Sequence, residues 1–185
     1  MQLSTRNWAA LFALGAILMV AWLASASTAD AASAKFHITS YESNRALELT
    51  PGGKVIEAPP NPSSPRQQWI QRNQPGGTAL WENAAGFPVK ACLAAPPDAT
   101  PTSTNKVVIR SCFQSLDKRL HWTRNTGVPF NAGVWMFNAH TGQTLVPEIC
   151  IVGPCSNDPS LLPGHLAEAF GTFAEWRFKF LGTVL

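Results

Sequence analysis

Four cysteines carry the most reactive side chains of this sequence, and their number and spacing restrict what they can do. They are Cys92, Cys112, Cys150 and Cys155, and all four follow an N-terminal apolar segment. In a secreted protein of this size, an even number of cysteines favours disulfides over metal ligands. Three pairings are open, among them Cys92 with Cys112 and Cys150 with Cys155. Neither pair has the two-residue spacing of a zinc ribbon, so a zinc site is the alternative with less support.

The other residues able to do acid–base or nucleophilic chemistry are scattered along the chain. The histidines, at His37, His121, His140 and His165, lack the spacing of a metal site. The carboxylates after Lys35 show no paired placement of the kind a glycosidase uses. No Gly-x-Ser-x-Gly turn and no His-Glu-x-x-His sequence is present. We therefore expect no enzyme, no metal and no cofactor.

The N-terminal segment, residues 1–34, has the pattern of a secretory signal peptide. Arg6 precedes an uncharged apolar run from Trp8 to Leu23. Small residues follow, and cleavage is expected between residues 26 and 34, after Ala26 or after Ala34. The run is shorter than the about 20 residues of a membrane span, although an uncleaved anchor is the alternative. We expect a secreted protein, extracellular or periplasmic, without stable membrane insertion after the signal is removed.

The 185 residues carry a formal net charge of +3, and this weak basicity is spread thinly. No run of Lys and Arg predicts a nucleic-acid partner, and a solvated surface explains the charge. From residue 35 onward, short strand-like stretches alternate with turns, and 15 prolines and 13 glycines interrupt any helix. Trp176 to Phe180 alternates apolar and basic residues, as a half-buried strand does. The sequence predicts one all-β domain at residues 35–185.

Three tryptophans recur at a nearly constant interval and divide this domain into three units. They are Trp69, Trp122 and Trp176, separated by 53 and 54 residues. A leucine in a short strand precedes each tryptophan, and these leucines are Leu47, Leu93 and Leu145. Further upstream, Trp81 and Trp135 are 54 residues apart, and Asn83 and Asn138 are 55 apart. Repetition at a fixed period determines the fold, and three units, about 35–74, 76–126 and 128–183, predict a closed barrel with threefold internal symmetry. Three blades are too few for a propeller.

The Gln67-Gln68-Trp69 sequence and its two echoes resemble the Gln-x-Trp repeat of the ricin-B-type lectins. That resemblance covers about residues 35–183 and implies a β-trefoil in which the three tryptophans are core residues. Lys90 to Leu93 and Arg110 to Cys112 look like the disulfide-linked hairpin of the family. The resemblance thus implies a Cys92–Cys112 disulfide and leaves Cys150 with Cys155.

Sugar binding in this family depends on an acidic residue after the strand leucine, an aromatic platform and an Asn-Gln pair. Glu48 and Gln67 occupy two of these places in the first unit, but Arg66 stands where Asn is expected and no aromatic platform precedes Trp69. The other units have Ala94 with Leu120 and Val146 with Ala174 at the corresponding places. Glu48 and Gln67 are therefore the candidate carbohydrate-binding residues. Trp81 and Trp135 are considered as platforms elsewhere or as core residues.

The resemblance implies a secreted carbohydrate-binding protein with weak or altered sugar specificity, whose partner is a glycan or a glycosylated surface. Two alternatives stay open. A protein-docking trefoil, similar to the accessory subunits of cytolethal distending toxins, would explain why the fold persists without the sugar-binding residues. A secreted trefoil protease inhibitor could present one of the proline-rich segments at 58–65 and 96–104.

Overall fold

The computed structural model describes residues 32–86, 90–125, 133–147, 157–163 and 175–184. All of these residues belong to one compact unit, Ala32–Val184. Residues 1–31 of the expected signal segment and the Cys150–Cys155 pair lie outside the described residues. Within the described ranges, no helix has the length and apolar character needed to cross a membrane.

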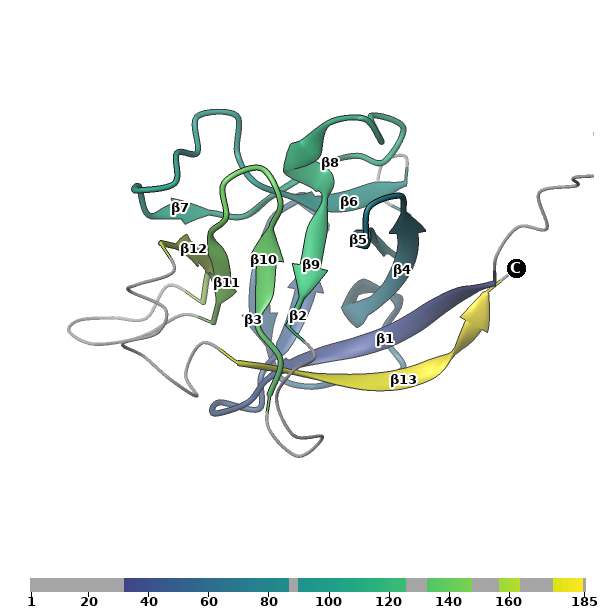
Figure 1. Cartoon of the computed structure of the whole chain (residues 1–185). Coiled ribbons are helices and arrows are strands. Elements are labelled where there is room, and N and C mark those ends of the chain that lie inside the picture. The colour runs from purple at the N-terminus through teal and green to yellow at the C-terminus, as the bar shows by residue number, and fades with distance from the viewer. Residues whose placement is uncertain (1–31, 87–89, 126–132, 148–156, 164–174, 185) are drawn as a thin grey trace, which may run out of the picture. The chain divides into compact units, whose positions relative to one another are not determined.

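Thirteen strands and two short 3-10 helices make up the described part of the chain (Figure 1). In chain order they are β1 (Ser33–Ser40), β2 (Ala46–Leu49), β3 (Val55–Ala58), η1 (Pro65–Gln67), β4 (Gln68–Gln74), β5 (Thr78–Asn83), β6 (Ala91–Ala94), β7 (Asn105–Lys106), β8 (Val108–Ser111), η2 (Lys118–Leu120), β9 (Trp122–Arg124), β10 (Met136–Asn138), β11 (Thr144–Val146), β12 (Ser160–Leu162) and β13 (Trp176–Val184). The all-β class predicted from the sequence is confirmed.

Six of these strands close on themselves. Antiparallel pairing runs from β1 to β4, β5, β9 and β10, and β13 pairs back with β1 along its whole length. A bridge between Val134 and Trp176 joins the segment before β10 to β13 and completes the ring. Its two backbone hydrogen bonds are 2.8 and 3.0 Å long. Closure of this kind removes the unpaired strand edges that an open sheet would expose.

Three further antiparallel pairs accompany the barrel, one in each unit. They are β2 with β3, β6 with β8, and β11 with β12. The second pair carries the Cys92–Cys112 disulfide implied by the resemblance, with the two Cα atoms 5.1 Å apart. A six-stranded barrel with one hairpin-like pair for each of three units is the β-trefoil architecture, and this prediction is confirmed.

Each repeated tryptophan occupies the same place in its unit. Trp69, Trp122 and Trp176 are at most 1% exposed. The indole Nε1–H of each donates, over 2.9 Å, to the backbone carbonyl of the leucine that precedes it in the sequence pattern: Leu47, Leu93 and Leu145 respectively. In each of the three units, this bond therefore joins the strand that carries the leucine (β2, β6 or β11) to the barrel strand that carries the tryptophan (β4, β9 or β13).

Strand register repeats with the tryptophans. Each tryptophan pairs with one residue in the first strand of its own unit and with one in the first strand of the next: Trp69 with Phe36 and Asn83, Trp122 with Ala79 and Asn138, Trp176 with Val134 and Ser40. The repeated asparagines have the same role, because the side-chain amides of Asn83 and Asn138 donate to the carbonyls of Arg66 and Arg119, each over 2.8 Å.

The register corrects one sequence alignment. Asn83 and Asn138 are equivalent, so the counterpart of Trp81 is Met136 and not Trp135. Trp81 and Met136 are both fully buried in the main core cluster, whereas Trp135 is only half-buried. A one-residue shift reverses the face of a strand on which a side chain lies. Trp81 and Trp135 therefore face different environments, although their interval suggested equivalence.

Gly133 provides a test of the barrel seam, the place where the segment before β10 meets β13. A Cβ atom at this position would lie 2.3 Å from the Cβ of Glu175, whose carboxylate accepts a hydrogen bond of 2.9 Å from the Gly133 N–H. We predict that Gly133→Ala destabilises the fold by about 1–3 kcal/mol through overpacking, measured by chemical denaturation. Gly52→Ala is the matched control, because its Cβ would meet only the Thr50 Oγ1 at 3.9 Å. Equal stability of the two variants would contradict this account of the seam.

Candidate functional site

Glu48 lies at the edge of a surface hollow in the first unit. It is half-buried in the middle of β2, between the buried residues Leu47 and Leu49. The hollow has a volume of about 540 Å³. It is lined by Glu48, the segment Ser64 to Arg66, and the turn residues Ala84 and Ala85 that follow β5. The first unit and the beginning of the second thus both contribute to the site.

Gln67 lies behind Glu48. Its side chain is 2% exposed at the end of η1, and its Nε2 donates to the Glu48 carboxylate over 2.6 Å and to the Pro59 carbonyl over 2.9 Å. Its Oε1 accepts from the Asn61 N–H over 2.6 Å and lies 3.1 Å from the His37 Nε2. The structure brings the two predicted residues together, but the amide is fully used within the protein. Gln67 therefore positions the carboxylate, and Glu48 is the one that borders the hollow.

Arg66 gives the hollow a second charged group. Its side chain is exposed and lines the hollow at the place where the resemblance implies an asparagine. The hollow thus combines a carboxylate, which accepts hydrogen bonds from hydroxyl groups, with a guanidinium, which only donates. No aromatic residue lines it. This arrangement can bind a polyhydroxylated ligand at its edge, without a ring on which the ligand could stack.

The second unit has an apolar cluster where the first has this polar network. Ala94 and Leu120, the counterparts of Glu48 and Gln67, are both fully buried. Leu80 is the counterpart of His37 in the strand register, and it packs in the same small cluster as Ala94 and Leu120. In the third unit Val146 is 2% exposed. Ala174 lies outside the described residues.

The two residues considered as sugar platforms differ in exposure. Trp81 is fully buried in the core and has no exposed face. Trp135 is half-buried and lies 6.0 Å from Phe137, measured between ring centroids.

His121 uses both ring nitrogens, at 3.0 Å from the Thr78 Oγ1 and 2.6 Å from the Ser115 carbonyl. Within the described ranges, no group of three or more His, Cys, Asp or Glu side chains could hold a metal ion.

A second hollow, of about 500 Å³, lies in the second unit and has a different chemistry. Two large apolar residues are exposed there, Phe113 at 70% and Leu116 at 95%. Beside them, Asp117 caps η2 and accepts hydrogen bonds of 2.7–3.1 Å from the Arg119 side chain and of 3.0 Å from Arg110. No position of the repeat coincides with Phe113, Leu116 or Asp117, so the sequence pattern did not indicate them.

The Asp117 cluster predicts a defined dependence of stability on pH. The hydrogen bonds from Arg119 hold the pKa of the Asp117 carboxyl at about 2, below its usual 3.8. Because the folded-state pKa is lowered, the stabilisation is fully present above about pH 4 and is lost as the pH falls through about 2. We expect Asp117→Asn to lower the free energy of unfolding by about 1 kcal/mol at pH 5 and by much less near pH 2.

The control for this titration is Asp98→Asn, which removes the same charge from an exposed loop position. Denaturant unfolding at several pH values measures both differences. A difference between Asp117→Asn and the parent protein that stays constant down to pH 2 would show that the charge of Asp117 does not stabilise η2.

Comparison with known proteins supports the fold and no closer relationship. No protein-family model and no curated protein sequence matches the chain. Among solved structures, the designed threefold-symmetric protein ThreeFoil is 17% identical, with a TM-score of 0.61 over 80% of this chain and 99% of that one. A ricin B-like lectin from Macrolepiota procera, in complex with lactose, is 16% identical, with a TM-score of 0.58 over 78% and 94%.

A third similar structure belongs to a larger protein. It is an exo-β-1,3-galactanase from Clostridium thermocellum, 13% identical, with a TM-score of 0.62 over 80% of this chain. The chain spans only 30% of the length of that protein. At these identities the likeness defines the class of fold alone: the chain is a β-trefoil.

Proposed function

We propose that this chain is an exported carbohydrate-binding β-trefoil with an altered sugar site in its first unit. The observation that supports the proposal most directly is the Glu48 carboxylate, held at the edge of a hollow by a buried amide 2.6 Å away. Buried polar groups that fix an exposed one are typical of a pre-organised binding site. The lactose complex of the Macrolepiota procera lectin adds that a similar trefoil binds a sugar.

The altered specificity follows from what lines the hollow. Glu48 accepts hydrogen bonds from two neighbouring hydroxyl groups of a sugar, and Arg66 replaces a neutral amide with a cation. Without an aromatic ring in the hollow, the apolar face of a sugar gains no stacking there. Affinity at this one site is therefore low, and effective attachment to a glycosylated surface needs several copies of the protein.

A glycan array probed with the mature protein tests this function. We expect binding to at least one neutral or acidic glycan, and a loss of at least about tenfold in Glu48→Gln, since a charge-assisted hydrogen bond contributes about 1.5–3 kcal/mol. Asp98→Asn is the matched control and should bind as the parent does. Binding that persists in Glu48→Gln would place the sugar site elsewhere, and no binding to any glycan would remove the proposed function.

A protein-docking role is the second candidate, and the hollow of the second unit favours it. Phe113 and Leu116 are exposed large apolar residues within one short segment, beside a paired set of charges. Interfaces combine an apolar centre with a polar rim in this way. A protein captured from the native secretome that is released by Phe113→Ser together with Leu116→Ser would support this role. If Glu48→Gln released the captured protein instead, the result would support binding through a glycan at the Glu48 hollow.

Export predicts a processing site that leaves β1 complete. Ser33 is 7% exposed, its backbone pairs with Val184, and its hydroxyl accepts a hydrogen bond of 3.1 Å from Arg72. Cleavage after Ala34 would remove two residues of this strand, whereas cleavage after Ala26 removes none. N-terminal sequencing of the exported protein should therefore give Ser27 as the first residue. A first residue of Lys35 would contradict this prediction.

A further inference from the structure

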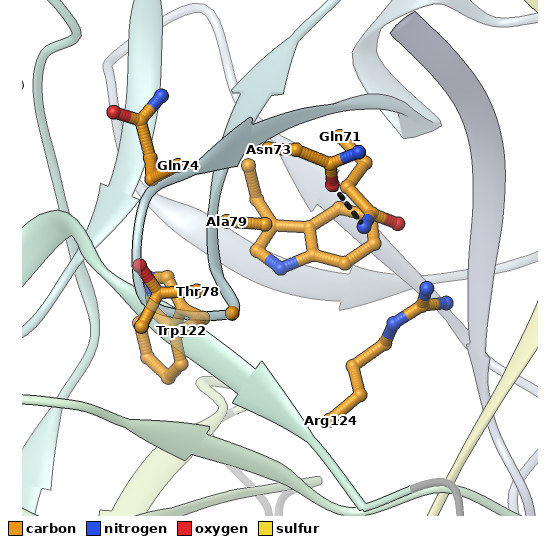
Figure 2. A pocket seen from close by; sticks show the side chains of 9 residues that line it. Gln71, Asn73, Gln74, Thr78, Ala79, Trp122 and Arg124 are labelled. Atoms are coloured by element: carbon orange, nitrogen blue, oxygen red, sulfur yellow. Dashed lines mark hydrogen bonds between the residues drawn. The ribbon is translucent and has the colours of Figure 1, made fainter.

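A pocket of about 300 Å³ lies between the β4–β5 hairpin and β9, apart from the Glu48 hollow (Figure 2). Strands β5 and β9 pair only at Ala79 and Trp122, and the pocket is lined by residues on both sides of this point. Gln71, Asn73 and Gln74 are among the lining residues, and the Gln71 Nε2 donates to the Asn73 Oδ1 over 2.7 Å, whereas the Gln74 side chain points away from both (Figure 2). From β9, the Arg124 side chain extends toward the wall that carries Gln71 (Figure 2).

The residues at the equivalent places of the three units differ around this pocket. Two residues after each repeated tryptophan, on the same face of the strand, lie Gln71, Arg124 and Phe178. On the neighbouring strand, the residues that pair with the three tryptophans are Phe36, Ala79 and Val134. The second unit therefore combines the smallest of the paired side chains with the only charged one.

Arg124 is a cation in unusual surroundings. Its guanidinium carbon lies 5.4, 5.5 and 5.1 Å from the ring centroids of Phe36, Trp81 and Phe178. None of the ion pairs in the described part of the chain includes it, and no described group accepts a hydrogen bond from it. Burial lowers the pKa of this guanidinium. Aromatic rings only partly offset the cost of removing a charge from water.

A second donor in the same wall lacks a partner. The indole Nε1–H of Trp81 is buried and has no acceptor among the described residues. Trp81 is fully buried and lines the pocket. Trp122, which also lines it, uses its own Nε1–H on the Leu93 carbonyl. Buried donors without acceptors are rare in folded proteins. Because Trp81 is fully buried, the Arg124 guanidinium is the donor in this pocket that an anionic oxygen would meet.

We propose that this pocket binds the carboxylate of an acidic monosaccharide, with Arg124 as the anion-binding residue. A carboxylate accepts the guanidinium hydrogen bonds, and the hydroxyl groups of the same ligand meet the amides of Gln71 and Asn73. A volume of about 300 Å³ lies at the lower end of the range for small-molecule pockets, about 300–1,000 Å³, and fits one sugar unit. The site is independent of the Glu48 hollow, which shares none of its lining residues.

Calorimetric titration of the mature protein with sodium glucuronate, glucose and sodium sulfate at constant ionic strength tests the proposal. Glucuronate should bind at least about tenfold more tightly than either glucose, which lacks the carboxylate, or sulfate, which lacks the hydroxyl groups. Equal binding of glucose would overturn the role of the anion. Equal binding of sulfate would overturn the role of the sugar. No saturable binding of glucuronate would overturn both.

Variants then locate the site. Arg124→Met keeps the apolar stem over the aromatic rings and removes the charge, and it should weaken glucuronate binding at least about tenfold. Arg177→Met is the matched control, because Arg177 stacks on Tyr41, 4.2 Å from its ring centroid, on an exposed part of β13. Unchanged binding in Arg124→Met would refute the assignment.

A second variant covers the case in which Arg124→Met does not fold. Ala79→Val introduces the residue that the third unit carries at this place, and it narrows the pocket without changing any charge. It should lower glucuronate affinity severalfold while Glu48-dependent binding to the glycan array persists. Loss of array binding together with normal glucuronate binding would contradict the proposed pocket.

Discussion

The bond from each repeated indole to a leucine carbonyl is the interaction on which the rest of this fold depends. It recurs at the same 2.9 Å length in all three units, although the chain between donor and acceptor spans 22, 29 and 31 residues. A large ring in the core contributes apolar burial, and its single polar atom must find an acceptor there. The bond therefore holds the leucine-bearing strand of each unit in one position against the barrel, whatever the length of chain between the leucine and the tryptophan.

This constancy explains what the sequence could predict. The tryptophan interval, the leucine before each tryptophan and the asparagine pair all report the barrel, because core contacts demand particular residues at particular registers. The tryptophan interval could not show which other side chains of the three units occupy equivalent places. Trp81 and Trp135 differ from equivalence by a single residue, and only the strand pairing shows that Met136 takes the place of Trp81.

The candidate sites were less predictable than the fold for a physical reason. Glu48 and Gln67 were found by their family positions, but the burial of Gln67 depends on Pro59, Asn61 and His37, which come from separate segments. Arg124 follows Trp122 in an unremarkable stretch, and nothing in its neighbours along the chain indicates three aromatic rings around it. Its environment comes from β1, β5 and β13, and so only the folded chain reveals it.

The seam between the two ends of the barrel also sets an order of events during synthesis. Strand β13 pairs with β1, and Trp176 pairs with Val134, so two of the six contacts around the barrel use the last of the described strands to be made. Contacts between distant parts of a chain form late, because the entropy of closing the long intervening loop must be overcome first. A ribosome that has not yet released residues 176–184 therefore holds an open barrel.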